Sequence, residues 1–249
     1  MRKMSYQRVS EICLKTGYLL INGGAESYRI EDTISRIGYS LGHRVNCYVT
    51  VTAVFIEVDG ETSKFIKSNL GGTNLQMIDD INTMSRQLAS HTLSPKDFVH
   101  EIDKIYQDKH TTDFPFYLKA FGAGLVSMAP MLISTMPLYY FIYCFIVGTI
   151  GYAISYYLSI ISPLPYVDLF ISGFTIALLG IILKDFNLIA NYHNIIIGAV
   201  MPLVPGVAIT NAFRELVMRH ALSGAVKLLD AVLVASSIGF GIATALIIF

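Results

Sequence analysis

Two prolines and a glycine, Pro202, Pro205 and Gly206, interrupt an apolar segment late in the sequence. A proline lacks the backbone N–H that continues a helix, so this spacing predicts a helix broken within a hydrophobic stretch. The carbonyls freed by the break, and the positive end of the helix that restarts near Gly206, favour a bound carboxylate. The alternative is a structural kink whose polar groups are satisfied by neighbouring helices.

Arg214 lies shortly after the predicted break and shares a helical face with Asn211. Because a guanidinium holds a carboxylate through two parallel hydrogen bonds, we expect Arg214 to bind an anionic or zwitterionic solute. The alternative is an anchor at the membrane interface that pairs locally with Glu215. The predicted substrate-binding residues are therefore Pro202, Pro205, Gly206, Asn211 and Arg214.

Ionisable residues within or at the edge of apolar segments are costly and become candidates for proton transfer. The candidates in this sequence are Asp168, Asp185, His193 and Asp230. If export is driven by protons moving inward, one of the three carboxylates must be reprotonated from outside. The alternatives are a solvated pair of Asp185 with Lys184, and a hydrogen-bonding role for His193 at the membrane interface.

A second polar cluster surrounds a Gly-Gly turn near the start of the sequence. In this cluster Ser27 could act as a nucleophile with His43 as its base, which would make the protein a membrane-anchored hydrolase. The sequence has no GxSxG, P-loop, GxGxxG or HExxH motif to support that interpretation. The alternative is that Glu26 and Glu31 favour the positive end of a helix while Arg29 pairs with a neighbouring acid.

The first 113 residues predict a small α+β domain that positions this cluster. Apolar residues at helical spacing predict helices, alternating residues predict strands, and Asp59-Gly60 predicts a hairpin turn. Ser94, Pro95 and Asp97 predict the start of the last helix. The predicted helices cover 6–22, a stretch around 30–41, 75–88 and 96–106, and the predicted strands cover 45–51, 54–58 and 62–68.

Residues 114–249 predict an all-α membrane domain. Each of its apolar stretches approaches the roughly 20 residues that cross a bilayer. Five spans are predicted, at about 116–135, 138–159, 166–184, 192–210 and 228–249, with the polar stretch 211–227 as the last separator.

The charges divide the sequence in the same way. Residues 1–113 hold 13 Lys/Arg and 14 Asp/Glu, whereas residues 114–249 hold 5 and 4. The formal net charge is zero, so nothing indicates binding to nucleic acid, and three scattered cysteines favour neither disulfides nor a metal site. With no signal peptide recognised and basic residues beside the spans, we expect a multi-pass protein of the inner (cytoplasmic) membrane with its N-terminal domain in the cytoplasm.

The segment LLINGGAESYRIEDTI at residues 19–34 resembles the N-terminal signature of the threonine/serine exporter family. Its polar and glycine residues, which we call the signature, are Asn22, Gly23, Gly24, Glu26, Tyr28, Arg29, Glu31 and Asp32. Further similarities to the family follow in the same order at 71–74, 203–206, 211, 214–215, 223–224 and 230–231.

This resemblance implies a secondary exporter of small carboxylate-bearing metabolites, without an ATPase and without a cofactor. The sequence is similar to the larger subunit of a two-subunit branch, which implies a small membrane partner that supplies a second half and allows a higher oligomer. That branch is associated with succinate as well as with threonine and serine, so the substrate stays open. A metabolite sensor that gates a partner is a further alternative.

Overall fold

The computed structural model describes residues 4–249 except 62, 69–73, 109–113 and 135. Within it the chain forms two compact units. The first contains the N-terminal region up to Asp113 together with Thr210–Leu228, and the second contains Phe114–Ile209 together with Leu229–Phe249. The predicted fold class, an α+β region followed by apolar membrane helices, is confirmed.

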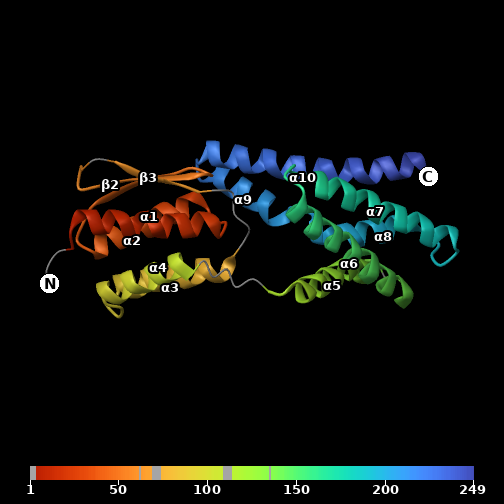
Figure 1. Ribbon diagram of the computed structural model, residues 1–249, viewed down its shortest axis with the longest axis horizontal. Helices are drawn as coiled ribbons and strands as arrows, with labels where there is room; N and C mark the ends of the chain where they lie inside the picture. The colour runs from red at the N-terminus through yellow and green to blue at the C-terminus, as the bar shows by residue number, and fades with distance from the viewer. Residues whose placement is uncertain (1–3, 62, 69–73, 109–113, 135) are drawn as a thin grey trace. The chain divides into compact units, whose positions relative to one another are not determined.

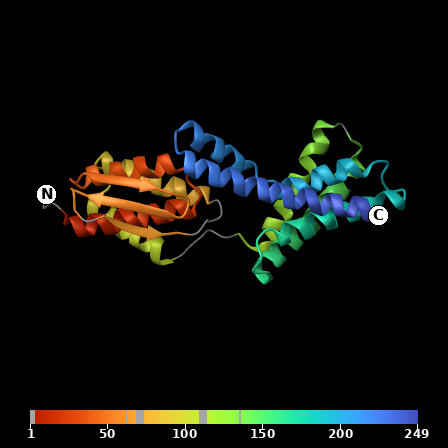
Figure 2. The same cartoon turned by 90° about the horizontal axis from the view of Figure 1, so that it is seen from above.

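The N-terminal region is built in three layers, with a sheet, a pair of helices and a second pair of helices (Figure 1). The sheet is antiparallel in the order β1-β2-β3, and its β2–β3 turn at Asp59 and Gly60 has positive φ at both residues, as a tight hairpin requires. Figure 2 shows the three strands side by side. The elements are α1 Tyr6–Asn22, α2 Ser27–Ser40, β1 Val45–Val49, β2 Ala53–Val58, β3 Lys64–Lys67, α3 Leu75–Ala89 and α4 Pro95–Asp108.

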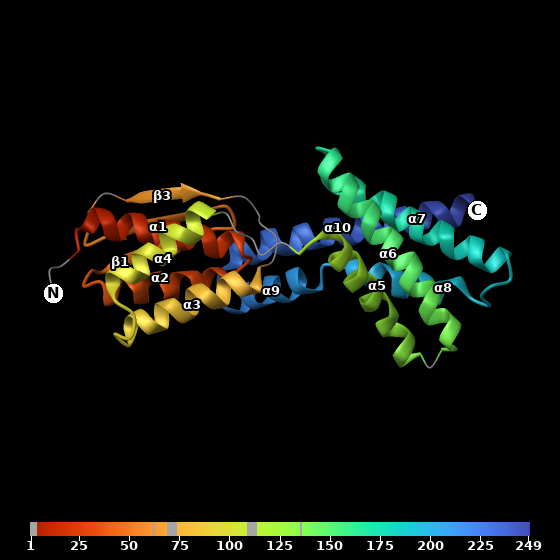
Figure 3. The same cartoon turned by 60° about the horizontal axis from the view of Figure 1, so that its bottom comes forward.

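The apolar faces of α1 and α2 pack between the sheet and the outer helices. Ile12 of α1 and Ile34 of α2 are fully buried. They belong to one hydrophobic core with Val54 of β2 and Phe98 of α4. Figure 3 shows α3 and α4 on the side of α1 and α2 that faces away from the sheet. The regular burial of one face explains why the helical periodicity of this region predicts its helices well.

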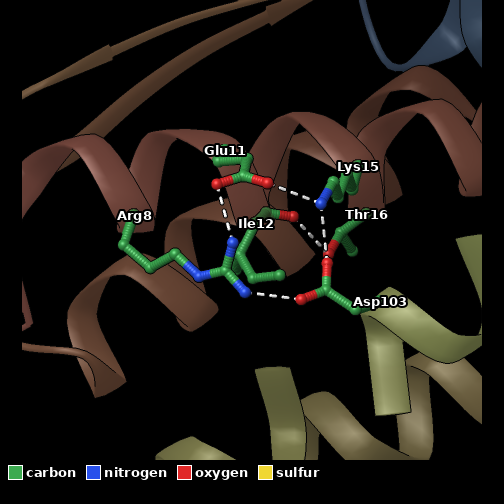
Figure 4. A network of polar contacts seen from close by, with 6 residues as sticks. All are labelled: Arg8, Glu11, Ile12, Lys15, Thr16 and Asp103. Atoms are coloured by element: carbon green, nitrogen blue, oxygen red, sulfur yellow. Dashed lines mark hydrogen bonds and ion pairs between the residues drawn. The ribbon is translucent and has the colours of Figure 1, made fainter. Parts of the chain in front are cut away.

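A network of charged side chains joins α4 to α1 (Figure 4). Asp103 of α4 accepts hydrogen bonds from Arg8 at 2.5 Å and from Lys15 at 2.7 Å. Glu11, between them on α1, accepts from the same two cations at 2.7 and 2.6 Å. The network therefore fixes the position of α4 against α1 outside the apolar core.

The second unit is made of apolar helices. Among the described residues, four helices are long and apolar enough to cross a membrane, namely α5 Phe116–Ile133, α6 Leu138–Ile161, α7 Val167–Asp185 and α10 Ala221–Ile248, of which α10 begins in the first unit. A fifth candidate span is the bent pair of α8 Tyr192–Val200, continued by a 3-10 turn at Met201–Leu203, and α9 Gly206–Val217. The two arms of this pair meet at 59°, so the predicted helix break is present.

Close contacts at small residues hold the membrane helices together. A Cβ built on Gly241 of α10 would lie 2.1 Å from the Phe170 carbonyl oxygen of α7, and one on Gly173 would lie 2.5 Å from that of Ile238. Tyr140 of α6 accepts hydrogen bonds from two backbone N–H groups that precede α8. Such backbone approach is the usual way in which membrane helices associate.

The polar stretch 211–227 differs from the predicted separator, because most of it is helical. It forms the second part of α9, a short turn, and the first two turns of α10. With 28 residues, α10 is about 42 Å long, whereas about 30 Å crosses the hydrocarbon layer. The polar residues therefore extend helices that continue as apolar segments, and they belong to the first compact unit.

Candidate functional site

The signature forms a fixed turn between α1 and α2. Gly24 has φ +82, a conformation that glycine adopts without strain, and the Ala25 N–H closes the turn on the Leu20 carbonyl at 3.0 Å. The Gly23 carbonyl accepts a hydrogen bond from the Asn74 N–H at 2.9 Å. Asn22, at the end of α1, accepts from the Ser68 hydroxyl at 2.8 Å. This turn sets the point at which α2 begins.

Arg214 lies against the signature within the first unit. It donates a hydrogen bond to the Glu26 carboxylate, which is 4% exposed and also lies 3.4 Å from Arg29. Tyr28 interacts with the Arg214 guanidinium as well. Burial opposes ionisation of Glu26, but a backbone hydrogen bond, the hydrogen bond from Arg214 and the two arginine charges outweigh it and lower the pKa of the carboxyl.

Glu215, the next residue of α9, is completely buried. Its Oε1 atom accepts three hydrogen bonds, from the Ser27 N–H at 2.8 Å, the Ser27 hydroxyl at 3.0 Å and the Lys227 ammonium at 2.6 Å. Its Oε2 atom has no hydrogen-bond partner in the part of the chain that the structure describes. The side chain of an N-cap residue usually accepts a hydrogen bond from a free N–H group at the start of its helix, but Glu26, the N-cap residue of α2, does not. Glu215 accepts from the Ser27 N–H at this helix start instead.

The remaining acidic residues of the signature have separate partners. Glu31 accepts a hydrogen bond from the Val49 N–H at 3.0 Å, and its second oxygen lies 3.7 Å from Nε2 of His220, which is in the turn between α9 and α10. Asp32 is exposed and pairs with Arg36 one helical turn later. Four residues of the signature region therefore contact the segment 210–228 among the described residues, namely Glu26, Ser27, Tyr28 and Glu31.

A small pocket of ≈ 50 Å³ lies beside this cluster. Ser27 and Lys227, two of the residues that bind Glu215, line it together with Thr50. The other lining residues are Ile21, Gly24, Ala25, Ile30, Val49 and Val51. The pocket therefore combines one cation and two hydroxyl side chains with mainly apolar walls.

Of the five predicted substrate-binding residues, Asn211 and Arg214 belong to the first unit, and Pro202, Pro205 and Gly206 belong to the second. Pro202 and Pro205 lie at the bend, and Gly206 begins α9. Asn211 is half-buried on α9, and Arg214 is bound to Glu26 instead of pairing with its neighbour Glu215. The guanidinium of Arg214 thus serves an internal carboxylate of the signature.

Two of the proton-transfer candidates have hydroxyl partners within the second unit. Asp168 accepts a hydrogen bond from Ser155 at 2.8 Å, and Asp230 accepts one from the Tyr166 hydroxyl at 2.7 Å. Asp185 and His193 are exposed at the ends of their helices. A role of any of the four residues in proton transfer stays a prediction.

Ser27 and His43 have different hydrogen-bond partners. The Ser27 hydroxyl donates to Glu215, whereas the ring nitrogens of His43 face Asp59 at 2.6 Å and the Met4 carbonyl at 2.7 Å. Burial raises the pKa of the Cys13 thiol to about 12, so this cysteine is a packing residue and not a nucleophile. The described hydrogen bonds do not join Ser27 to His43 as the hydrolase interpretation requires.

Sequence reasoning missed Glu215 and Lys227 as members of the cluster. Consecutive residues of α9, Arg214 and Glu215, meet the consecutive residues Glu26 and Ser27 at a separation of 188 positions in each pair. The available signal was an acidic residue, Glu215, next to Arg214 in a mainly apolar helix, because a buried charge calls for a partner.

Comparisons with known proteins find a matching family and a related sequence. The sequence model of a family described as "Putative threonine/serine exporter" matches residues 11–249. A protein of Haemophilus influenzae, described as "Uncharacterized protein", is 24% identical over 255 residues, which cover 86% of this chain and 84% of that protein. No solved structure matches the chain.

Proposed function

Because the chain belongs to the threonine/serine exporter family, we propose that it is one subunit of a secondary active exporter for small carboxylate-bearing metabolites. The observation that carries this proposal is the broken span, 59° at its bend, in a chain that the family matches almost throughout. Interrupted helices expose backbone groups that bind solutes and ions in many secondary transporters, whereas a membrane tether needs none. The substrates of this proposal are amino acids of the threonine and serine type or dicarboxylates of the succinate type.

The signature has a definite place in this proposal. Glu26 and Ser27 hold the end of α9, and the same helix begins at Gly206 beside the bend. We propose that the first unit lies in the cytoplasm and that it sets the position of α9 through these contacts. The signature would then act on the broken span through a continuous helix.

The proposal includes a small membrane subunit as partner and allows a higher oligomer. Gly122 of α5 and Gly239 of α10 support it, because a Cβ built on either would meet nothing within 4 Å. Small residues that no described helix of this chain covers are suited to close packing against helices of another chain.

The test is transport by vesicles that contain the purified chain and its partner. They are loaded with labelled serine, threonine or succinate, and efflux is followed with an imposed proton gradient and without ATP. The proposal predicts efflux that an ionophore abolishes when it collapses the gradient. Efflux that requires ATP, or no efflux of any of the three solutes, would contradict it.

A further inference from the structure

The outer face of the antiparallel sheet carries a row of three aromatic side chains. Tyr48 of β1, Phe55 of β2 and Phe65 of β3 are direct neighbours across the strands, because Phe55 pairs with both of the others. The ring centroids of Tyr48 and Phe55 are 6.4 Å apart, and those of Phe55 and Phe65 are 5.6 Å apart in a stacked arrangement. We call these three residues the aromatic row.

The aromatic row lies on the side of the sheet that faces away from α1 and α2. The residues that alternate with Phe55 on β2, Val54 and Ile56, point to the other side and belong to the hydrophobic core. In Figure 2 the three strands lie in front of the helices of this unit. The side chains of the row are 56%, 40% and 66% exposed, from β1 to β3. A contiguous exposed surface of this kind is typical of an interaction site.

The charges on this face have opposite signs on the two sides of the row. On β2 the residues that flank Phe55 on the same face are Glu57 and Ala53. Glu57 pairs with Asn46 of β1, whose amide lies 3.5 Å from the carboxylate. Ala53 pairs with Lys67 of β3, which is exposed. One side of the row is therefore acidic and the other is basic.

We propose that this face binds the same face of a second copy of the chain, with the aromatic row of one copy against that of the other. A twofold axis along the row places each side of one sheet against the opposite side of the other sheet. Glu57 of each copy then lies beside Lys67 of the other copy, and the contact contains two such pairs. Face-to-face packing is a common arrangement of antiparallel sheets.

The balance of charge favours a second copy over other partners. Single-stranded nucleic acid also stacks on aromatic side chains, but it needs a positively charged groove along its backbone. An anionic membrane surface likewise attracts clusters of basic residues. On this face Glu57 offsets Lys67, and Arg44 and Asp59 beyond Glu57 add one charge of each sign. A twofold contact uses both signs of charge, whereas the other two partners need an excess of positive charge.

The exposed area indicates a weak contact. An aromatic side chain offers about 150–250 Å² for burial, so the row leaves roughly 300 Å² uncovered in each copy. Two copies would bury about 600 Å² at the rings, whereas stable interfaces in solution bury at least about 1,200 Å². Copies anchored in one membrane meet at a high local concentration, which favours a weak contact. The dimer is therefore expected in the membrane and much less in dilute solution.

The first arm of the test cross-links full-length chains in vesicles. Glu57→Cys and Lys67→Cys are made in separate, differently tagged chains that also carry Cys47→Ser, since Cys47 is the half-buried cysteine of the sheet. Treated together with a short bis-maleimide, the two chains should form mixed dimers. Each chain alone should form few, because the two equivalent cysteines lie on opposite sides of the row.

The control for this arm is Tyr39→Cys, at an exposed position on α2. Mixed with either sheet variant, it should give only background cross-linking. No mixed cross-link between positions 57 and 67 above that background would overturn the proposal.

The second arm tests the charges by mixing two variants. Glu57→Lys leaves lysine on both sides of the row and Lys67→Glu leaves carboxylates on both sides, so each variant alone should dimerise less than the unaltered chain. An equal mixture should dimerise again, because every lysine then meets a carboxylate of the other copy. Fluorescence energy transfer between labelled copies in vesicles measures the dimer. A mixture that dimerises no better than either variant alone would refute the twofold arrangement.

The third arm removes an aromatic ring. Phe65→Ser should weaken dimerisation at least about tenfold, because buried aromatic residues carry much of the binding energy of an interface. Tyr39→Ser removes an exposed aromatic ring of α2 and should leave dimerisation unchanged. Equal effects of the two changes would contradict the proposal. So would an unaltered chain that stays monomeric in vesicles and binds a single-stranded oligonucleotide through Phe65.

None of these measurements uses transport, so the proposal and the exporter function can fail separately. A chain that transports but does not cross-link between 57 and 67 would retain the exporter function and remove this interface. A chain that cross-links as expected but transports nothing would retain the interface and remove the exporter function.

Discussion

Arg214 of α9 donates a hydrogen bond to Glu26, which lies 188 positions earlier at the start of α2. The pair joins the signature to the helix that begins at the proline break. It is one of several polar contacts between the signature region and residues 210–228, and it can be reversed by exchanging two charges. The first prediction uses this property.

Exchange of the charges at 26 and 214 in one double variant should restore part of the stability and of the export rate that either single change removes. Glu26→Arg places an arginine beside Arg214 and Arg29, and Arg214→Glu places two carboxylates together, so both single variants should melt at lower temperature and export more slowly. The double variant should recover part of both losses, because it reforms the pair in reverse. Melting curves and efflux rates measure the effect.

The matched control is the exposed pair of Asp32 and Arg36. Asp32→Asn should change neither the melting temperature nor the efflux rate measurably, because exposed ion pairs contribute little. If the double variant at 26 and 214 loses as much melting temperature and efflux rate as the two single variants together, the pair does not hold α9.

The Glu26 carboxyl should make stability depend on acid pH. Its pKa is lowered in the folded chain, so its contribution is present above its ordinary pKa of about 4.3 and is lost as pH falls through the folded value. Glu26→Gln should therefore be less stable than the unaltered chain at pH 7, with a difference that shrinks as the pH falls below the ordinary pKa of the carboxyl. Denaturant titrations over this range measure it, and a difference that is constant with pH would contradict it.

Two glycines of α10 should respond in opposite ways to alanine. Gly241→Ala forces a methyl group against the Phe170 carbonyl of α7, whereas Gly239→Ala meets nothing within 4 Å. Gly241→Ala should lower the free energy of unfolding by about 1–3 kcal/mol, because the added methyl group overpacks the helix contact. The second should be neutral or slightly stabilising in this chain alone. Thermal melting in detergent compares them, and equal melting temperatures would show that α7 and α10 do not pack as described.

The same pair of variants also tests the proposed partner. If a helix of another subunit packs at Gly239, Gly239→Ala should weaken copurification of the two subunits while leaving the isolated chain stable. Normal copurification would remove this surface from the proposal.

The network of Asp103 should anchor α4. Asp103→Asn keeps the shape but removes the charge that binds Arg8 and Lys15, and we expect a loss of about 1 kcal/mol in the free energy of unfolding, since a partly buried network exceeds a single exposed pair. Asp79→Asn, on the exposed side of α3, is the control. Urea unfolding followed by circular dichroism measures both, and equal losses would mean that the network does not stabilise the fold.

Local patterns predicted most of the fold. The limits of α1 agree with the helix predicted from Tyr6 to Asn22. Ser94 caps the start of α4 as expected, because its hydroxyl oxygen accepts a hydrogen bond from the Asp97 N–H, and the same hydroxyl donates to the Asp97 carboxylate. The turn at Asp59 and the break at Pro205 also follow from single residues whose backbone preferences are strong. In these cases the deciding interactions lie within a few residues of sequence.

The site was less accessible to sequence reasoning. Arg214 and Glu215 could be recognised as unusual, but their partners are fixed by packing across the whole chain and not by spacing. The helical start of α10 was also missed, because Ser223, Gly224 and Lys227 interrupt the apolar pattern of residues 221–227. A tertiary contact of this start, the hydrogen bond from Lys227 to Glu215 of α9, is not visible in the local sequence.

The most direct test of the exporter account is efflux of labelled serine from vesicles that contain this chain alone, the small membrane partner alone, or both. The account predicts efflux when both subunits are present, background efflux from each alone, and loss of efflux when the proton gradient is collapsed. Efflux from this chain alone would contradict the two-subunit proposal. Background efflux of serine, threonine and succinate from all three preparations would contradict the exporter function itself.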